Sequence, residues 1–169
     1  MAWLSAFLLA ATTVSCDDAV NNKRLPAYPV LINLSNPGLW NTYGVGGVMQ
    51  YREFIKEQNI PSNFPWLGST ATGFGGVLLC GVDAASNFAD ETWPYLPVAY
   101  DMCCPVEADQ NIRVYVNDRF EAVCPECKSH YTLLSGGGPL SGPAVGLRYG
   151  LEPYKCVGSP MTGFIITRR

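Results

Sequence analysis

The alternation of apolar and polar residues predicts that this chain is built mainly from strands. The clearest pattern covers residues 112–124, where apolar residues occupy every second position up to Val116 and again from Phe120. Asn117 and Asp118, between the two halves, are turn residues that tolerate left-handed backbone conformations. We therefore expect a β-hairpin over these residues.

Other short apolar stretches, bounded by glycine and proline, are also typical of strands. We expect them at residues 27–35, 73–83, 94–101, 129–134, 145–152 and 163–169. Residues 48–58 form the stretch that predicts a short helix or an irregular strand, and residues 135–144 predict a glycine-rich loop. Because helical periodicity is almost absent, the predicted fold class is all-β.

The N-terminal segment has the pattern of an export signal. Residues 2–14 are uncharged and rich in Leu, Ala and Phe, a length that suits the apolar part of a signal peptide and is too short to span a bilayer. The run ends at Cys16, before Asp17 and Asp18, and resembles a bacterial lipoprotein signal, in which such a cysteine becomes the lipidated first residue. A buried N-terminal helix is the alternative, but the abrupt change to polar residues argues against it.

This resemblance implies a division of the chain and a location. We expect a signal peptide over residues 1–15, lipidation of Cys16, a polar tether over residues 16–27 and a single domain over residues 28–169. The protein would then be anchored by its lipid to a membrane of the bacterial cell envelope. Its expected partners are that membrane and an unknown protein.

Composition and charge narrow the class of protein. The chain has 169 residues, of which 48% are hydrophobic and 15% charged, and these values fit one globular domain. A net charge of -3 provides no basic surface for phosphate backbones, so nucleic acid is not an expected partner. The chain contains one histidine, His130, and no Ser/His/Asp arrangement is available without it. The sequence therefore does not point to a hydrolase or to another enzyme.

The cysteines of the predicted domain carry its candidate chemistry. Two of them, Cys80 and Cys156, stand alone, and the other four form two clusters on either side of the hairpin: Cys103 and Cys104, then Cys124 and Cys127. Because the first strand of the hairpin follows one cluster and the second strand enters the other, folding brings both clusters to the same end of the sheet.

Residues 98–107 and 124–152 together resemble a Rieske iron-sulfur domain, from its first ligand loop to its final strands. In that family, two loops joined by a hairpin hold a 2Fe-2S cluster through two cysteines and two histidines. The second loop continues into a glycine turn and a Gly-Pro-Ala segment, which "GGGPLSGPA" reproduces. The resemblance implies antiparallel sheets with a small subdomain that carries the ligand loops.

Carried over by position, the resemblance places Cys104 and Cys124 at the two cysteine ligands. The two histidine positions fall on Val106 and Cys127, so neither histidine is present. His130 lies at a strand position, where we expect a side chain on the sheet surface. These residues cannot form the standard Rieske centre, in which imidazole ligands raise the reduction potential.

The altered ligand set leaves several interpretations open. Cys104, Cys124 and Cys127, with Cys103 or Asp101 as a fourth donor, could hold zinc or an atypical 2Fe-2S cluster. The adjacent side chains of Cys103 and Cys104 point to opposite faces of an extended chain, however, which argues against a joint role.

Two further interpretations need no metal. A disulfide between the two loops would suit an exported domain, and some Rieske proteins have one between these loops. Residues 124–127 also have the spacing of a redox Cys-x-x-Cys pair. Catalytic pairs of that kind lie at a helix N-terminus, whereas this one lies between strands, so we do not expect thioredoxin-like catalysis.

We expect an exported, lipid-anchored, Rieske-like protein that has lost the standard cluster, binds no cofactor and serves as a structural or interaction domain. No twin-arginine motif precedes the apolar segment, and a chain exported unfolded would arrive without a cluster. The alternatives are an electron-transfer protein with atypical cysteine ligation and a structural zinc-binding protein.

Overall fold

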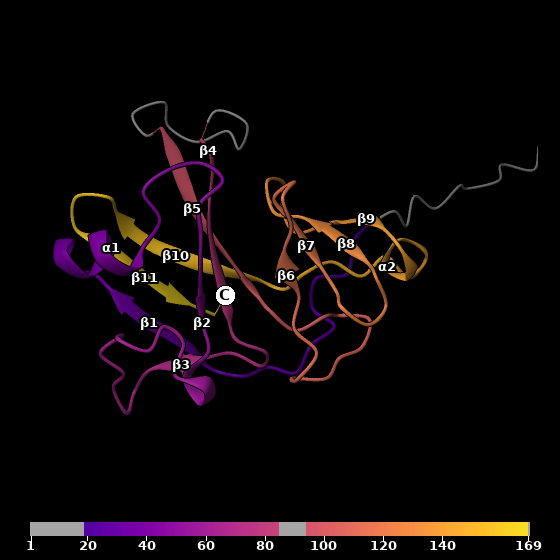
Figure 1. Cartoon of the computed structure of the whole chain (residues 1–169), viewed down its shortest axis with the longest axis horizontal. Helices are drawn as coiled ribbons and strands as arrows, with labels where there is room; N and C mark the ends of the chain where they lie inside the picture. Colours follow the sequence, from indigo (N-terminus) through magenta and orange to yellow (C-terminus); the bar gives the residue numbers. More distant parts are fainter. Residues whose placement is uncertain (1–18, 85–93, 169) are drawn as a thin grey trace, which may run out of the picture.

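The computed structural model describes residues 19–84 and 94–168 (Figure 1). The predicted signal peptide over residues 1–15 and the predicted lipidation site Cys16 lie outside these residues, so both stay predictions. Within the described residues, no helix is long and apolar enough to cross a membrane.

Most of the regular secondary structure in the described residues is antiparallel β-sheet, which confirms the predicted fold class at this level. Among the described residues, seven strands make one sheet in the order β2-β4-β5-β10-β11-β1-β3, and this sheet curls into a nearly closed, barrel-like shape. We call it the large sheet. Its strands are β1 (Val30–Leu34), β2 (Tyr51–Phe54), β3 (Ala71–Thr72), β4 (Val77–Asp83), β5 (Tyr95–Asp101), β10 (Pro153–Ser159) and β11 (Gly163–Thr167).

Strand β4 lies between two hydrophobic cores. It pairs with β2 on one side and β5 on the other, and its side chains are buried on both faces, as a continuous apolar run predicts. Because side chains alternate along a strand, Val77 and Leu79 join the core of the large sheet. Leu78 and Cys80 face the opposite way and join a second core.

A smaller sheet is inserted in the chain between β5 and β10. The inserted subdomain, as we call residues 102–152, lies beside the large sheet (Figure 1). Its described elements are β6 (Tyr115–Val116), β7 (Glu121–Val123), β8 (His130–Thr132), β9 (Pro139–Ser141) and the short helix α2 (Pro143–Leu147). Strands β6 to β9 follow one another in the sheet in chain order.

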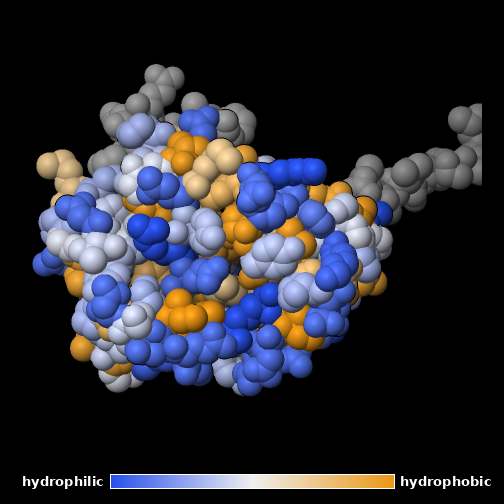
Figure 2. Space-filling view, viewed as in Figure 1, coloured by the Kyte–Doolittle hydropathy of each residue, from blue (hydrophilic) through white to orange (hydrophobic). Residues whose placement is uncertain are grey.

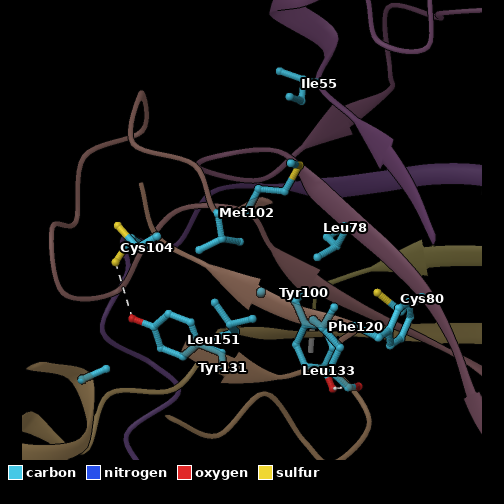
Figure 3. Packing of buried hydrophobic residues seen from close by; sticks show 14 residues of the cluster. Ile55, Leu78, Cys80, Tyr100, Met102, Cys104, Phe120, Tyr131, Leu133 and Leu151 are labelled. Carbon is cyan, nitrogen blue, oxygen red and sulfur yellow. Dashed lines mark hydrogen bonds between the residues drawn. The ribbon is translucent and has the colours of Figure 1, made fainter. Parts of the chain in front are cut away.

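The second core fixes the inserted subdomain to the large sheet. Leu78 and Tyr100 from the large sheet pack with Tyr131, Leu133 and Leu151 from the subdomain, and all five are almost completely buried (Figure 3). Burying apolar side chains of this size contributes about 1.5 to 3 kcal/mol each, so this contact holds the two parts in a defined arrangement.

The hairpin predicted over residues 112–124 is confirmed, since Val116 pairs with Ala122 across β6 and β7. The left-handed residue of its turn is Phe120, with φ of 59°. The Asn117 side chain accepts two backbone N–H groups of the turn, and the Phe120 ring is buried. This turn capping and burial offset the strain of a left-handed non-glycine residue.

The strand predicted over residues 145–152 is wrong. Helix α2 occupies its first part, because Pro143 suits the first turn of a helix and Arg148 ends it in a left-handed conformation, with φ of 55°. The strand that pairs with β11 is instead β10. The sequence analysis missed β10 because only one of its side chains, Tyr154, is buried.

Helix α1 (Pro37–Tyr43) was also not predicted. The Asn36 side chain caps it by accepting the backbone N–H groups of Gly38 and Leu39, and Trp40 packs its ring 4.6 Å from that of Phe164. The Asn-Pro pair before the helix is the sequence signal for this start. The ambiguous stretch at residues 48–58 forms β2 and a single 3-10 turn at Lys56–Gln58.

The surface combines polar and apolar residues. On the face shown in Figure 2, apolar side chains lie singly or in small groups among polar ones. Large exposed apolar residues include Met161 in the turn between β10 and β11, Leu67 in a loop and Tyr115 on β6. Single exposed apolar residues are normal on protein surfaces and do not by themselves mark an interface.

Candidate metal centre

Three cysteines from two loops meet at one end of the inserted subdomain. The sulfur atoms of Cys104, Cys124 and Cys127 all lie within 4.8 Å of one another, and those of Cys104 and Cys127 are 3.6 Å apart. In a tetrahedral site with metal–sulfur bonds of 2.3 Å, two ligand sulfurs are separated by about 3.8 Å. The three thiols are therefore spaced so that one metal ion could bind between them.

Backbone hydrogen bonds hold the two loops in place. The N–H of Cys104 donates to the carbonyl of Ile112 at 3.0 Å, and the N–H of Cys124 donates to the carbonyl of Ser129 at 3.0 Å. Cys104 follows β5, whereas Cys124 and Cys127 lie in the turn between β7 and β8. As the sequence predicted, the hairpin brings the two cysteine clusters together.

Two hydroxyl groups contact the thiols. The Tyr131 hydroxyl lies 3.4 Å from the Cys104 sulfur (Figure 3). The Cys127 thiol donates to the Ser129 hydroxyl oxygen at 3.2 Å, and the same oxygen accepts the backbone N–H of Ala144 from helix α2. Hydrogen bonds of this kind orient metal ligands and stabilise their charge once they ionise. The sequence analysis did not single out Ser129 or Tyr131, since their roles depend on strand β8 facing the loop.

Burial keeps the Cys104 and Cys124 thiols protonated when no cation is near. Burial raises the pKa of Cys124 to about 12. It also raises the pKa of Cys104, although the hydrogen bond from Tyr131 and the backbone N–H groups of Glu107 and Val106 lower that pKa. A bound cation reverses this preference because a coordinating thiol loses its proton. A soft metal ion would therefore bind these thiols with release of their protons.

Cys103, a predicted fourth donor, does not join the group. Its sulfur lies 3.2 Å from the carbonyl oxygen of Asp109, to which it donates, and burial raises its pKa. The side chains of Cys103 and Cys104 thus have different surroundings, as expected for neighbours that point to opposite faces.

Asp101, the other predicted fourth donor, is fully used in the fold. Its carboxylate accepts the backbone N–H groups of Phe74, Gly75 and Cys103 and the hydroxyl of Tyr154. Burial raises the pKa of Asp101, and these four donors oppose the rise. The carboxylate ties the loop before β4 to the start of the inserted subdomain, so its role is structural.

Val106 and His130, the two other positions named from the sequence, do not provide a metal ligand to the three-cysteine group. Val106, at a lost histidine position, packs against the second core. His130 lies on β8 with its Nδ1 2.8 Å from a carboxylate oxygen of Glu121, and its side chain is partly exposed. This position agrees with the expectation that His130 is a sheet-surface side chain.

The donors fit a single ion better than the two-iron centre that the Rieske resemblance implies. In that centre two cysteines bind one iron and two histidines bind the other, so the ligand pairs stand on opposite sides of the cluster. Here the three thiols are close together, and the histidine positions hold valine and cysteine. Thiolate ligands of this number and spacing suit zinc or another soft ion in tetrahedral geometry.

No family model, curated protein or solved structure matches this chain. The Rieske resemblance therefore stays an interpretation of the motifs around the two loops. The site itself rests on the three sulfur atoms and on the contacts that position them. Cys80 and Cys156, which lie on β4 and β10, belong to neither loop and are free.

Proposed function

We propose that this protein is an exported, Rieske-like domain that binds one structural zinc ion through Cys104, Cys124 and Cys127. The observation that carries the proposal is the mutual spacing of the three sulfur atoms, all within 4.8 Å. Zinc suits sulfur-rich tetrahedral sites and has no redox chemistry of its own. The ion would stabilise the fold rather than transfer electrons.

The position of the site supports a structural role. An ion bound to Cys104 and to the turn at residues 124–127 would link two loops that are 20 residues apart in the chain. Strands β6, β7 and β8, which follow the first loop and flank the second, have only two or three residues each, so they make few ladder hydrogen bonds. A metal crosslink supplies stability that such a small sheet lacks.

A disulfide between Cys104 and Cys127 is the second candidate, and their sulfur separation of 3.6 Å favours this pair over the others. Bond formation would bring the sulfurs to about 2.05 Å and would release two protons and two electrons to an oxidant of the envelope. In that case the domain would be cluster-free, as the sequence analysis expected. The proposed lipid anchor at Cys16 and the proposed role as an interaction domain are compatible with both the zinc-bound and the disulfide-bonded form.

The metal content of the purified chain tests the proposal. The full chain, purified under reducing and anaerobic conditions in a mild detergent, should contain one zinc per chain and show no visible absorption. Replacing Cys124 by serine should abolish stoichiometric zinc because it removes a ligand. Replacing Cys156 by serine is the matched control and should leave zinc unchanged, since Cys156 lies away from the site on β10.

Other results would identify the competing functions. Iron and sulfide in equal amounts, with a brown colour, would replace the zinc proposal by an electron-transfer protein with atypical ligation. A second preparation without reductant that contains no metal, and in which mass spectrometry finds Cys104 bonded to Cys127, would replace it by the disulfide form.

A further inference from the structure

The two cysteine loops contain the same turn. Each begins with a Cys-Pro pair, Cys104-Pro105 in one and Cys124-Pro125 in the other, and three turn residues follow the cysteine in both. The fourth residue after each cysteine is left-handed: Ala108 has φ of 52° and Lys128 has φ of 58°. Left-handed residues other than glycine are uncommon, so their occurrence at the same place in both turns marks one shared backbone conformation.

The hydrogen bonds to sulfur are also the same. In the first turn, the backbone N–H groups of Val106 and Glu107 donate to the Cys104 sulfur. In the second turn, the N–H groups of Glu126 and Cys127 donate to the Cys124 sulfur. In both turns the donors are the second and third residues after the cysteine. N–H groups directed at a sulfur stabilise its thiolate form, which is the form that binds metal.

This equivalence relates Glu107 to Cys127. Both are the third residue after the first cysteine of their turn. The first cysteine of one turn, Cys104, contacts the third residue of the other, Cys127, at 3.6 Å. In a pair of equivalent turns that face each other, the reciprocal contact would join Cys124 to Glu107.

The Glu107 side chain is available for that contact. It is exposed, and within the described residues its carboxylate takes part in no hydrogen bond or ion pair. The other nearby donors are occupied: the Asp101 carboxylate accepts four hydrogen bonds, the Cys103 thiol donates to the Asp109 carbonyl, and His130 pairs with Glu121. Rotation about the side-chain bonds of Glu107 is therefore not opposed by other contacts.

We propose that Glu107 is the fourth ligand, so that three thiolates and one carboxylate surround the ion. This inference rests on the proposed metal-binding function and names the residue that completes its site. Glutamate oxygens bind zinc at about 2.0 to 2.2 Å, and three sulfurs with one oxygen form an ordinary tetrahedral set. The sequence analysis named Cys103 and Asp101 as fourth donors and missed Glu107, because the equivalence of the turns is a property of the backbone.

Cobalt(II), a spectroscopic substitute for zinc, tests the assignment in the full chain. We expect Glu107→Gln to bind cobalt and zinc on the order of 100-fold more weakly than the wild type, since it loses a charged ligand. Glu107→Cys should restore tight binding and shift the cobalt absorption bands to those of four thiolates. The matched control is Glu57→Gln, which removes an exposed glutamate from the 3-10 turn at Lys56–Gln58, outside the inserted subdomain, and should bind cobalt as the wild type does.

The results separate this inference from the proposal on which it rests. If the wild type binds one metal ion per chain and Glu107→Gln binds it equally well, then Glu107 is not a ligand and the three-cysteine site stands. An unchanged cobalt spectrum in Glu107→Cys would lead to the same conclusion. If the wild type binds neither zinc nor cobalt in stoichiometric amount, both proposals are overturned.

Discussion

The large sheet and the inserted subdomain keep their structures in different ways. Strands β4 and β5 of the large sheet have seven residues each, and the core beside them contains several aromatic rings in contact, such as Phe54 with Phe64 at 5.3 Å. The strands of the subdomain have two or three residues. Its loops depend instead on capped turns and on hydrogen bonds to cysteine sulfur.

The large sheet therefore supplies most of the stability of the chain, whereas the inserted subdomain carries its reactive thiols. Apolar burial in the large sheet is independent of solution conditions such as metal concentration, and it supplies a firm base. The subdomain places three thiols next to one another, and a metal ion or a disulfide at those thiols would affect how firmly its own loops are held. A metal or redox change would therefore act on the subdomain and leave the large sheet intact.

The largest expected effect concerns the core of the large sheet. Replacing Leu79, which is completely buried, by alanine should lower the free energy of unfolding by about 3 to 4 kcal/mol, because it leaves a cavity between the strands. The loss should be the same with zinc and with a chelator, as measured by chemical denaturation. Leu31→Ala, on an exposed face of β1, is the control and should change the free energy by less than about 0.5 kcal/mol. If the loss of unfolding free energy in Leu79→Ala depended on zinc, the stability of the large sheet would not be independent of the metal site in the subdomain.

The next effect concerns the pH dependence of metal affinity in the subdomain. Burial raises the pKa of both Cys104 and Cys124, so both thiols carry protons at neutral pH without metal and lose them when the ion binds. The release of at least these two protons makes the apparent zinc affinity rise by at least about 100-fold per pH unit as the pH increases. Competition with a chelator of known pH dependence measures this slope. The Cys156→Ser variant should show the same slope, and an affinity independent of pH would mean that the thiols are not the ligands.

The smallest effect concerns a partly exposed ion pair between the two inner strands of the subdomain, β7 and β8. Hydrogen bonds from His130 and Asn117 lower the pKa of Glu121 below its ordinary value of 4.5. A lowered pKa in the folded state contributes stability that is present above the ordinary value and is lost as the pH falls through the folded pKa. Glu121→Gln should therefore lower the thermal unfolding midpoint slightly at neutral pH and not at all once Glu121 is protonated. Asp118→Asn, in the same turn, is the control, and an equal change at both pH values would rule out this electrostatic cause.

Local patterns predicted the parts of the fold where neighbouring residues decide the structure. The alternation from Ile112 to Cys124 predicted the hairpin, and the apolar run around Leu79 predicted a strand, which the structure shows to be buried on both faces. Residues 145–147 of helix α2 were mistaken for strand because the apolar residues there also suit a strand. Pro143 and Arg148 set the ends of the helix through backbone conformation. Strand β10 was missed because most of its side chains face outward.

The sequence by itself determined the residue types of the site and the end of the sheet at which they meet. The order of cysteines around one hairpin was sufficient for this, since strand pairing has a fixed spacing and direction. Only the tertiary structure decided which cysteines share a site. Cys104 and Cys103 are neighbours in the chain, but one sulfur faces Cys127 and the other faces the carbonyl of Asp109. The physical reason is that side-chain direction depends on backbone torsion angles and packing, which residue identity alone does not determine.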